Sequence, residues 1–432
     1  MSNSKRAVLL CDGGYYGTLA ATRTLGLYEI PVLVADQSML APALWSRHVS
    51  YRLRCPPAAD TERFVNWARA VGQKYRQPVI YATSDDVAVV LALYRSELER
   101  DFRFYQPDLD TLLYLLDKSR LAHVVRGAGL DMPDTWIPDS LRHAEEVIRD
   151  QPGSLLIKPR TQCLLNTHSK GAIVIGGRED SVRAYADFCR RNVLAPQLAA
   201  RFPDWKLPII QRYHPEAVDG VYSIAGFIDR GGKNMAVRAA EKVLQLPSRL
   251  GTGLCFRSAL VDSVLALGLQ QLLQRIGYFG VFEAEFIRVG GRSLLIDING
   301  RLYNQLAFDV ARGLPLPTLF YEGALGNEQA VAAATVAAAI GPSTGPQAFC
   351  NRSRLRTILQ LRRILRTIPV QEAKRWREWY RADLDSIIDA AADSGDRWPM
   401  RSDLLLQLCS YMRHPRAFLR SYGKSQDQGA RS

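Results

Sequence analysis

The stretch Gly280–Gln305, GVFEAEFIRVGGRSLLIDINGRLYNQ, decides the fold class of this 432-residue chain. Apolar and polar residues alternate on both sides of a Gly-Gly pair, which predicts two antiparallel strands joined by a tight turn. We expect a three-residue loop of residues 290–292, because a two-residue loop would break the pairing of the polar side chains. The expected cross-strand pairs are then Val289–Ser293, Glu285–Asp297 and Glu283–Asn299.

Two carboxylates that face each other across a strand pair repel unless a cation lies between them. Glu285 and Asp297 would be such a pair, with Asn299 beside them. Oxygen ligands suit Mg²⁺, which usually also takes oxygens from substrate phosphates. The hairpin therefore predicts a metal–phosphate site, and the alternative is a solvated hairpin face with unpaired acids.

Size and composition indicate a globular protein with two or three domains. The seven cysteines are scattered and form no CxxC pair, which favours a reducing compartment, the cytoplasm, over a disulfide framework or a zinc site. The start of the chain reads as a first strand and not as a signal peptide. No apolar run reaches the roughly 18 residues of a membrane span, so no transmembrane segment is expected.

The first part of the chain, residues 1–108, alternates strands and helices, which is typical of a parallel α/β sheet. We expect strands at residues 6–12, 30–36 and 78–86, with helices at 18–28 and 61–76. Ligands of such sheets bind at the carboxyl ends of the strands. Four residues lie at these ends and are candidate substrate contacts: Gly13, Gly14, Ser84 and Asp85.

The glycines of this region also allow a different interpretation. A glycine-rich turn before a helix can hold an anion, and Asp36 at the end of the second strand could bind a ribose, as in dinucleotide-binding folds. GGYYG is not the GxGxxG pattern, however, and a tight strand–helix turn explains it equally well. A nicotinamide-dependent oxidoreductase is therefore an alternative function.

Lys158 lies within an apolar strand at residues 154–160, where a lysine needs a partner. A strand lysine that faces a cleft commonly pairs with phosphate oxygens, and the alternative is a strand-end lysine in solvent. Ser169, in the polar loop 161–171, could close over the phosphates. Arg301 follows Asn299 closely and could neutralise a phosphoryl group. Nothing in the sequence indicates a nucleophilic triad, and neither His168 nor His214 is assigned a proton-transfer role.

Several of these segments resemble, in their order and spacing, the ATP-grasp superfamily, most of all its carboxylate–amine ligase branch near the carbamoyl-phosphate-synthase-like fold. The resemblance covers roughly residues 6–325. The matching segments are GGYYG with LGLYEIPVLVAD, TSDD, DKSRLAHVVRGAGLDMPDTW, LLIKP, IIQRYHPEAVDGVYS, EKVLQLPSRLGTG and FEAEF with IDINGR. Two departures are an unclear glycine-rich phosphate loop after Lys158 and NGR in place of the frequent NPR.

The resemblance implies an α/β ATP-grasp fold with three parts. These are a Rossmann-like pre-ATP-grasp domain over residues 1–108, an ATP-grasp domain over 109–328 with a lid subdomain at about 135–215, and a basic helical extension over 345–432. It also implies roles for single residues. The implied metal ligands are Glu285, Asp297 and Asn299, and the implied nucleotide contacts are Lys118, Lys158, Ser169, Gln211, Arg212, Tyr213, His214 and Asp219. The implied catalytic arginines are Arg301 and, as a fainter match, Arg238.

The activity implied by the resemblance is ligation of a carboxylate to an amine. ATP would convert the carboxylate into an acyl phosphate, and amine attack would release ADP and phosphate. ATP and Mg²⁺, or Mn²⁺ in its place, are the expected cofactors, and the expected partners are a small carboxylate, a small amine and, as one option, a second copy in a homodimer. A non-catalytic nucleotide-binding protein is a further alternative.

The net charge of +13 is concentrated near the end of the chain. Residues 352–381 hold ten Lys or Arg against two Glu, and leucines and isoleucines recur there at helical spacing. We expect residues 351–422 to be helical, either packed on the ligase with a solvated basic face or contacting an acidic partner or an anionic membrane surface. Nucleic acid is not expected as a partner, because no recognised nucleic-acid module is present.

Overall fold

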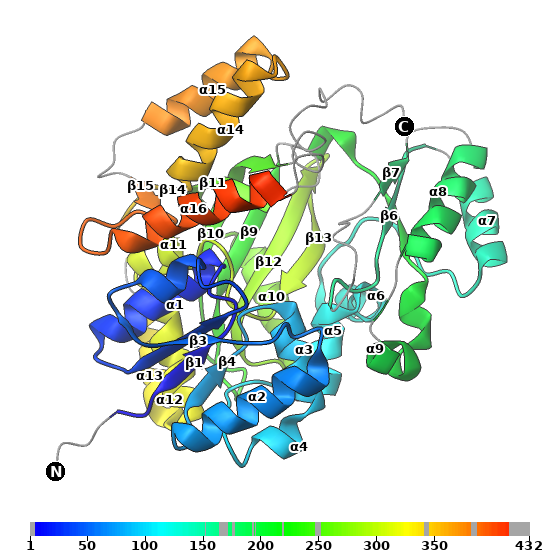
Figure 1. The fold of residues 1–432 in the computed structure, drawn as a ribbon. Coiled ribbons are helices and arrows are strands. Elements are labelled where there is room, and N and C mark those ends of the chain that lie inside the picture. Colours follow the sequence, from blue (N-terminus) through cyan, green and yellow to red (C-terminus); the bar gives the residue numbers. More distant parts are fainter. Residues whose placement is uncertain are drawn as a thin grey trace.

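The computed structural model describes residues 5–151, 153–163, 172–174, 178–191, 194, 196–217, 220–246, 252–340, 345–381 and 387–413. Figure 1 shows a parallel-sheet domain in blue, a large central sheet in green and yellow, a smaller sheet with helices beside it, and helices in orange and red near the end of the chain. No helix among these residues is long and apolar enough to cross a membrane.

The first domain is the parallel α/β unit that the sequence predicts. Its four described strands are β1 (Val8–Leu10), β2 (Val32–Asp36), β3 (Val49–Arg54) and β4 (Val79–Tyr81), in the order β3-β2-β1-β4. Its helices are α1 (Tyr16–Leu27), α2 (Thr61–Lys74), α3 (Asp85–Leu93) and the short α4 (Arg95–Leu98). The predicted strand at 78–86 is too long, because Ser84 accepts a hydrogen bond from the Val87 amide and so caps helix α3.

The central sheet is antiparallel except at one edge. Its described strands follow the order β13-β12-β9-β10-β11-β14-β15. Their bounds are β9 (Val221–Ile228), β10 (Met235–Leu246), β11 (Thr252–Ala259), β12 (Gly280–Val289), β13 (Arg292–Asn299), β14 (Ala348–Cys350) and β15 (Ile387–Asp389). The helices that follow in sequence within this region are α10 (Ser263–Arg275), α11 (Leu306–Ala311), α12 (Leu316–Ala324) and α13 (Glu328–Ile340).

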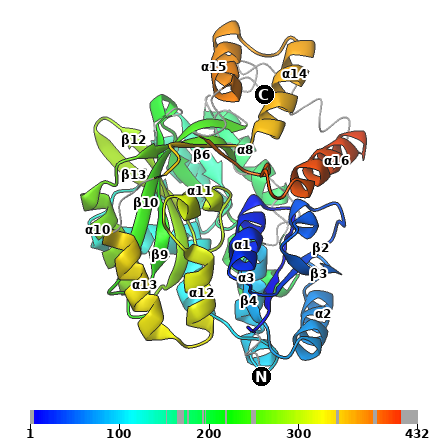
Figure 2. The ribbon, with the colours of Figure 1, turned by 90° about the vertical axis from the view of Figure 1, so that its left-hand side faces the viewer.

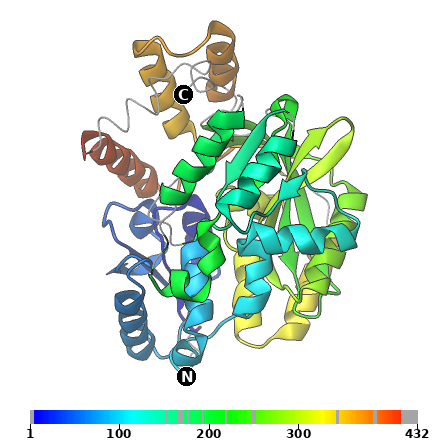
Figure 3. The same cartoon turned by 90° about the vertical axis from the view of Figure 1, so that its right-hand side faces the viewer.

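A third unit, which we call the lid subdomain, lies between residues 135 and 212. Its described sheet has the order β5-β8-β6-β7, with β5 (Thr135–Trp136), β6 (Leu155–Lys158), β7 (Ala172–Val174) and β8 (Ile209–Arg212). Helices α7 (Leu141–Asp150), α8 (Arg178–Arg191) and α9 (Pro196–Arg201) complete it. Figure 3 shows the lid subdomain nearest the viewer, beside the central sheet.

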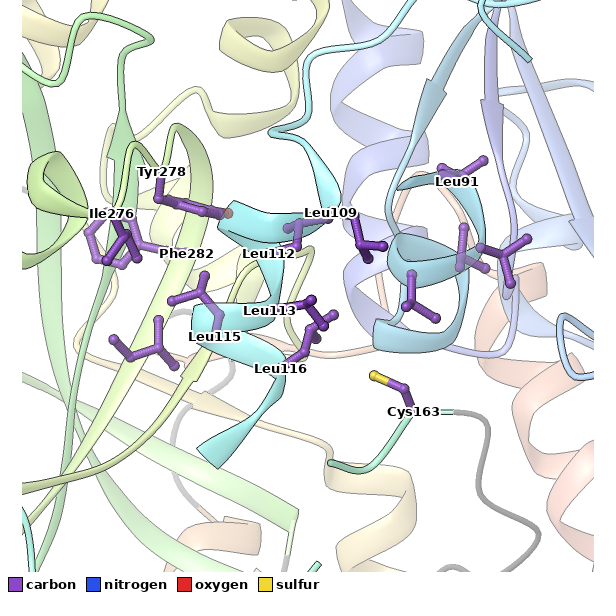
Figure 4. Packing of buried hydrophobic residues seen from close by; sticks show 14 of the residues in the cluster. Leu91, Leu109, Leu112, Leu113, Leu115, Leu116, Cys163, Ile276, Tyr278 and Phe282 are labelled. Carbon is purple, nitrogen blue, oxygen red and sulfur yellow. The ribbon is translucent and has the colours of Figure 1, made fainter. Parts of the chain in front are cut away.

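Two helices, α5 (Leu109–Leu116) and α6 (Lys118–Val125), connect the first domain to the lid subdomain. The α5 leucines are buried in a core that includes residues of both the first domain and the central sheet. Figure 4 shows these leucines between Tyr278 and Phe282 of the central-sheet region and Leu91 of helix α3. Each Å² of apolar surface that these leucines bury contributes about 25 cal/mol to stability. The shared core therefore holds the first domain against the central sheet.

The C-terminal region is less uniform than the sequence predicts. Helices α14 (Arg352–Ile364) and α15 (Val370–Arg381) form a hairpin that projects from the body (Figure 2). Strand β15 then pairs parallel to β14, so the expectation of an entirely helical segment is wrong. The backbone of residues 387–389 gains its hydrogen-bond partners at the sheet edge, which outweighs local helical preference.

Helix α16 (Trp398–Arg413) returns to the first domain and closes the fold. Asp396, just before it, accepts hydrogen bonds from Arg23 Nε at 2.9 Å, Ser46 Oγ at 2.7 Å and the Arg47 amide at 2.9 Å. Asp403 accepts from the hydroxyl of Tyr16 at 3.1 Å, at the start of helix α1. Residues 387–413, which we call the strap, therefore fix the first domain to the edge of the central sheet.

Candidate functional site

The β12–β13 hairpin places its carboxylates in register by a route that the sequence did not reveal. The turn has two residues, Gly290 and Gly291, both with positive φ, so Val289 pairs with Arg292 and the expected three-residue loop is wrong. A β-bulge at Ile296, between the Glu285–Asp297 and Phe286–Leu295 pairs, then restores the register. Glu285 faces Asp297 and Glu283 faces Asn299, as the sequence predicts.

Each of the two opposed carboxylates has its own lysine. The Lys118 ammonium lies 2.6 Å from Asp297 Oδ1, and the Lys242 ammonium lies 2.6 Å from Glu285 Oε1. Burial lowers the pKa of Lys118, but Asp297 outweighs this effect and the pKa is raised overall. Glu285 outweighs the burial of Lys242 in the same way and raises the pKa of that lysine. The repulsion between Glu285 and Asp297 is therefore offset by two lysine side chains of the protein itself.

Lys158, at the end of β6, is in a different electrostatic state. Its side chain is buried, and no carboxylate within the described residues forms an ion pair with it. Burial, with the nearby charge of Lys118, lowers the pKa of Lys158 to about 8. A buried lysine without an anion favours a ligand that brings negative charge.

A second group of polar contacts links the hairpin to the first domain. Arg301 donates from Nε to Asp85 Oδ1 at 2.9 Å and from Nη2 to Asn299 Oδ1 at 3.1 Å. Asp85 is at the start of helix α3, so this ion pair joins two domains across the site. Partial burial lowers the pKa of Arg301, but the carboxylate of Asp85 outweighs this effect, raises the pKa overall and keeps the guanidinium charged.

Glu283 lies behind these groups and is held by two amides. It accepts a hydrogen bond from Asn299 Nδ2 at 3.1 Å and another from Gln305 Nε2. Burial and the like charge of Glu285 raise the pKa of Glu283 to about 7. At neutral pH this carboxyl is therefore near its midpoint between the neutral and charged forms.

All of these groups border one cavity of about 480 Å³ between the lid subdomain, the central sheet and the first domain. The residues from Gln211 to His214 line its lid side, where β8 ends. The amide of Tyr213 donates to the carbonyl of Ser154 at 3.1 Å, and Gln211 donates from Nε2 to Thr135 Oγ1 at 3.0 Å. This segment is thus fixed by its own sheet while it borders the cavity.

The first domain contributes a different set of residues to the cavity from the one expected. Ser84 and Asp85 line it, together with Tyr15, Gly17 and Asp86. Gly13 and Gly14 do not: the Gly14 amide donates to Asp36 Oδ2 at 2.9 Å, and a Cβ at Gly13 would lie 3.1 Å from Val34. The small size of Gly13 serves the packing of the turn. Asp36 also accepts a hydrogen bond from the Ser38 amide at 2.7 Å, so both oxygens of its carboxylate bind backbone amides of the protein.

Gly17 has a packing reason that the sequence did not show. A Cβ at this position would lie 2.6 Å from the carbonyl oxygen of Tyr303, in the segment directly after Arg301. Only glycine allows this approach of helix α1 to the segment after the hairpin. The glycine is thus required for the contact between two walls of the cavity.

Arg238 lies apart from the cavity. It is within strand β10 and is buried. Its guanidinium donates to the carbonyl oxygens of Arg312 at 3.0 Å and Ala338 at 3.2 Å. These contacts support a structural role, in which Arg238 ties the sheet to the segment after α11 and to helix α13. The predicted roles of Ser169 and Asp219 fall outside the described residues, as does His168.

Lys242 is the residue that the sequence reasoning missed. It shares a face of β10 with Arg238 but lies four residues further along, roughly 13 Å in an extended strand, where the cavity begins. The alternating segment from Arg238 to Lys242 carried a signal for a strand. The sequence contains no signal that Lys242 pairs with Glu285 of a distant strand.

The donor set of the hairpin fits a magnesium ion that arrives with a phosphate ligand. Within the described part of the chain, no cluster of three or more His, Cys, Asp or Glu side chains is arranged to hold a metal by itself. Mg²⁺ is usually bound through one or two carboxylates plus substrate phosphates, which matches the oxygens of Glu285, Asp297 and Asn299. No complete protein cage is needed for this type of site.

Comparisons with known proteins place this geometry in a known fold. No family model matches the sequence, and no curated protein matches it. A biotin carboxylase from Campylobacter jejuni, solved as a complex with β-γ-ATP, is similar with a TM-score of 0.59 and 14% identity over 74% of this chain and 71% of that chain.

Two further structures extend the comparison. The biotin carboxylase domain of the Hydrogenobacter thermophilus 2-oxoglutarate carboxylase, in complex with MgADP and bicarbonate, has a TM-score of 0.57 and 17% identity over 74% of this chain and 70% of that chain. An L-amino acid ligase from Bacillus licheniformis has a TM-score of 0.55 and 13% identity over 75% and 74%. The first-domain sheet, the lid subdomain and the central sheet together therefore show that this chain has the ATP-grasp fold.

Proposed function

We propose that this protein is an ATP-dependent ligase that activates a carboxylate as an acyl phosphate and joins it to an amine. The observation that carries the proposal is Lys158, a buried lysine with a lowered pKa and no described ion-pair partner, beside two lysine-neutralised carboxylates in one cavity. A triphosphate would supply the negative charge that Lys158 lacks. The similar structures support this, because their ligands are a nucleotide and, in one case, bicarbonate.

The nucleotide would occupy the lid side of the cavity. We infer that the segment from Gln211 to His214 contacts the base, and that Lys118 and Lys158 contact phosphate oxygens. Glu285, Asp297 and Asn299 would hold Mg²⁺, or Mn²⁺, which would screen phosphate charge and polarise the transferred group. Asp219 and Ser169 remain candidates for the ribose and the phosphates.

The acceptor carboxylate would lie near Arg301, between the hairpin and the first domain. The negative charge of a carboxylate repels a γ-phosphate, and the guanidinium of Arg301 would reduce that repulsion. Attack of a carboxylate oxygen on the γ-phosphorus breaks its bond to the bridging oxygen and releases ADP. The product is an acyl phosphate with a good leaving group.

The amine would approach from the first-domain side, where Ser84 and Asp85 line the cavity. Its nitrogen attacks the acyl carbon, the carbon–oxygen bond to phosphate breaks, and the nitrogen loses a proton. The products are an amide, ADP and phosphate. Exclusion of water by the lid subdomain would protect the acyl phosphate from hydrolysis. A small carboxylate and a small amine are the substrate classes, with an amino acid as the first choice for each.

Product formation tests this proposal directly. The full chain is incubated with Mg-ATP and pooled amino acids and carboxylic acids, and ADP release is measured together with mass-resolved products. We expect ADP release that requires Mg²⁺ and both substrates, and a product mass equal to acid plus amine minus water. Mg-ATP binding without turnover in a broad screen would favour the non-catalytic alternative. Asp297→Asn serves as the inactive control.

Assembly is a separate expectation. The Hydrogenobacter thermophilus domain is described as a dimer, and we propose a homodimer for this chain as well. Analytical ultracentrifugation of the full chain measures its mass in solution. A monomer over a wide range of protein concentrations would contradict this expectation.

A further inference from the structure

The hairpin of helices α14 and α15 presents a surface of unusual composition. Figures 1 and 2 show both helices projecting from the body, with their connecting turn at the far end. The inner faces of the two helices pack against the body: Leu355, Ile358 and Trp376 are buried in one small core with residues of β10 and β11. Arg362 is buried and paired with Glu372 at 3.0 Å, which ties the two helices to each other.

The outer faces of the hairpin are strongly basic. Six exposed cations are distributed over both helices and the turn, against one exposed acid, Glu378. The exposed cations are Arg356, Arg363, Arg366, Lys374, Arg377 and Arg381. Positive charge is therefore concentrated on the exposed surface of this projecting hairpin.

The tip of the hairpin adds exposed aliphatic side chains to this charge. Ile364 ends helix α14 and is 76% exposed, and Val370 begins helix α15 and is 87% exposed. The turn between them contains Ile368, which is half-buried, and Pro369, which is exposed. Exposed aliphatic side chains gain no hydrophobic stabilisation while they stay in water, so their presence on both sides of a turn favours a binding surface. Arginines and a lysine lie close to them in the sequence.

We propose that the tip of this hairpin docks on an anionic lipid bilayer. Cations next to exposed aliphatic residues are the composition of a segment that lies in the membrane interface, with the aliphatic groups among the acyl chains and the cations at the headgroups. The projecting shape fits a flat surface. The proposal is independent of the ligase reaction, since none of these residues borders the catalytic cavity.

Two other classes of acidic partner fit these observations less well. A nucleic acid would use the cations but would leave Ile364 and Val370 in water, and the hairpin's Trp376 is buried and cannot stack on a base. An acidic protein would need an apolar groove of its own for a projecting tip. A bilayer accepts both features without a specific complementary shape.

Vesicle binding by the full chain tests the proposal. Co-sedimentation is measured with vesicles of equimolar phosphatidylserine and phosphatidylcholine and with vesicles of phosphatidylcholine alone. We expect binding to the anionic vesicles only, and weaker binding as salt is added. A chain that binds neither kind, or both equally, would overturn the proposal.

Two sets of variants separate charge from insertion. Arg363→Gln, Arg366→Gln and Lys374→Gln together should weaken binding roughly one hundredfold, because each basic residue near an anionic surface contributes roughly fivefold. Ile364→Ser with Val370→Ser should weaken it at least about tenfold. If the serine pair leaves binding unchanged, or if soluble polyglutamate binds as tightly as the vesicles, the tip does not insert and the proposal is wrong.

Matched controls come from the rest of the chain. Arg63, Arg142 and Arg183 lie on three other helices with side chains 75%, 89% and 76% exposed, so their triple change to Gln removes the same charge. Leu260 and Val264 are 93% and 72% exposed and match the aliphatic pair. Both control sets should bind within about threefold of the unaltered chain. Losses equal to those of the hairpin variants would contradict docking through the tip.

Discussion

The two ends of the cavity carry different sets of charged side chains. One end holds Lys118 of helix α6, Lys158 of the lid subdomain and Lys242 of the central sheet. Asp85 and Asp86 lie at the other end, which is formed by helix α3 of the first domain. Two of the lysines are neutralised by hairpin carboxylates and the third is not. The charge of Lys158, which no described carboxylate neutralises, favours an anionic ligand at the first end, whereas Asp85 at the second end is paired with Arg301.

The largest expected effect is on turnover at the lysine end. Glu285→Gln removes the carboxylate that pairs with Lys242 and is a proposed Mg²⁺ ligand, so turnover should fall about 10³-fold. ADP release with the acid and amine pair found by screening, measured across a Mg²⁺ titration, gives the value.

Glu241→Gln is the matched control for this change. The Glu241 carboxylate lies 2.6 Å from the exposed Arg257 and is not part of the cavity wall. It should retain turnover within about threefold, since a surface ion pair contributes little. Full activity of the Glu285→Gln variant would refute the metal assignment, and a lowered thermal midpoint would show that its loss comes from misfolding.

The next effect is on nucleotide affinity. Lys158→Met keeps the length of the side chain but removes its charge, which should weaken Mg-ATP binding by about 1.5–3 kcal/mol, or roughly tenfold to a hundredfold. Titration calorimetry of the full chain measures the affinity. Lys233→Met, at an exposed lysine after β9, is the control. Equal affinities of the two variants would show that Lys158 does not bind phosphate.

A smaller effect is expected from pH. Since burial lowers the pKa of Lys158 to about 8, the lysine is charged below that pH and loses its proton above it. Mg-ATP affinity should therefore fall about tenfold between pH 7 and pH 9, with uptake of a proton on binding near pH 8. Calorimetry in buffers of different ionisation enthalpy measures that uptake.

Glu283 titrates near this range, since its pKa is raised to about 7, so a second variant is needed. Glu283→Gln should keep the fall in affinity above pH 8, and Lys158→Met should abolish it. If the fall persists without the lysine, another group is responsible.

A change at the acidic end should affect nucleotide binding less. Asp85→Asn removes the charge that pairs with Arg301 but touches none of the lysines, so Mg-ATP affinity should stay within about threefold while turnover falls. The same calorimetric titration applies. A loss of affinity as large as that of Lys158→Met would mean that the two ends act as one site and that the comparison is wrong.

The smallest effect is expected from a nicotinamide cofactor. The Asp36 carboxylate is used by the amides of Gly14 and Ser38, so it has little reason to bind a ribose. NADH should shift the thermal midpoint by less than about 1 °C, whereas saturating Mg-ATP should raise it by several degrees. Stabilisation by NADH alone would favour an oxidoreductase and reverse the proposed function.

Prediction from the sequence succeeded where local pattern and fold agree. Alternation on both sides of Gly290 and Gly291 predicts the hairpin, and the apolar strands before Gly13 and Ser84 predict the parallel sheet. These features depend on residues close in sequence, which is why one chain was enough to predict them.

The errors have a common physical origin in contacts between distant residues. The bulge at Ile296 compensates for the short turn, and the alternating pattern alone contains no signal for an unpaired residue. Lys242 gains its role from Glu285, a residue 43 positions away. Strand β15 forms because β14 offers it an edge, and Arg238 is held by carbonyls 74 and 100 positions away.

The strap has a consequence for biosynthesis. Tyr16 at the start of helix α1 contacts Asp403, 387 positions later, and Arg23 contacts Asp396, 373 positions later. As the ribosome makes the chain from its amino end, the first domain emerges long before these partners exist. The face of helix α1 that carries Tyr16 and Arg23 must therefore wait for residues 387–413 before it gains its native partners. A nascent chain arrested ahead of residue 387 should leave this face of the helix open to chaperones and proteases, even though the residues that line the cavity have already been made.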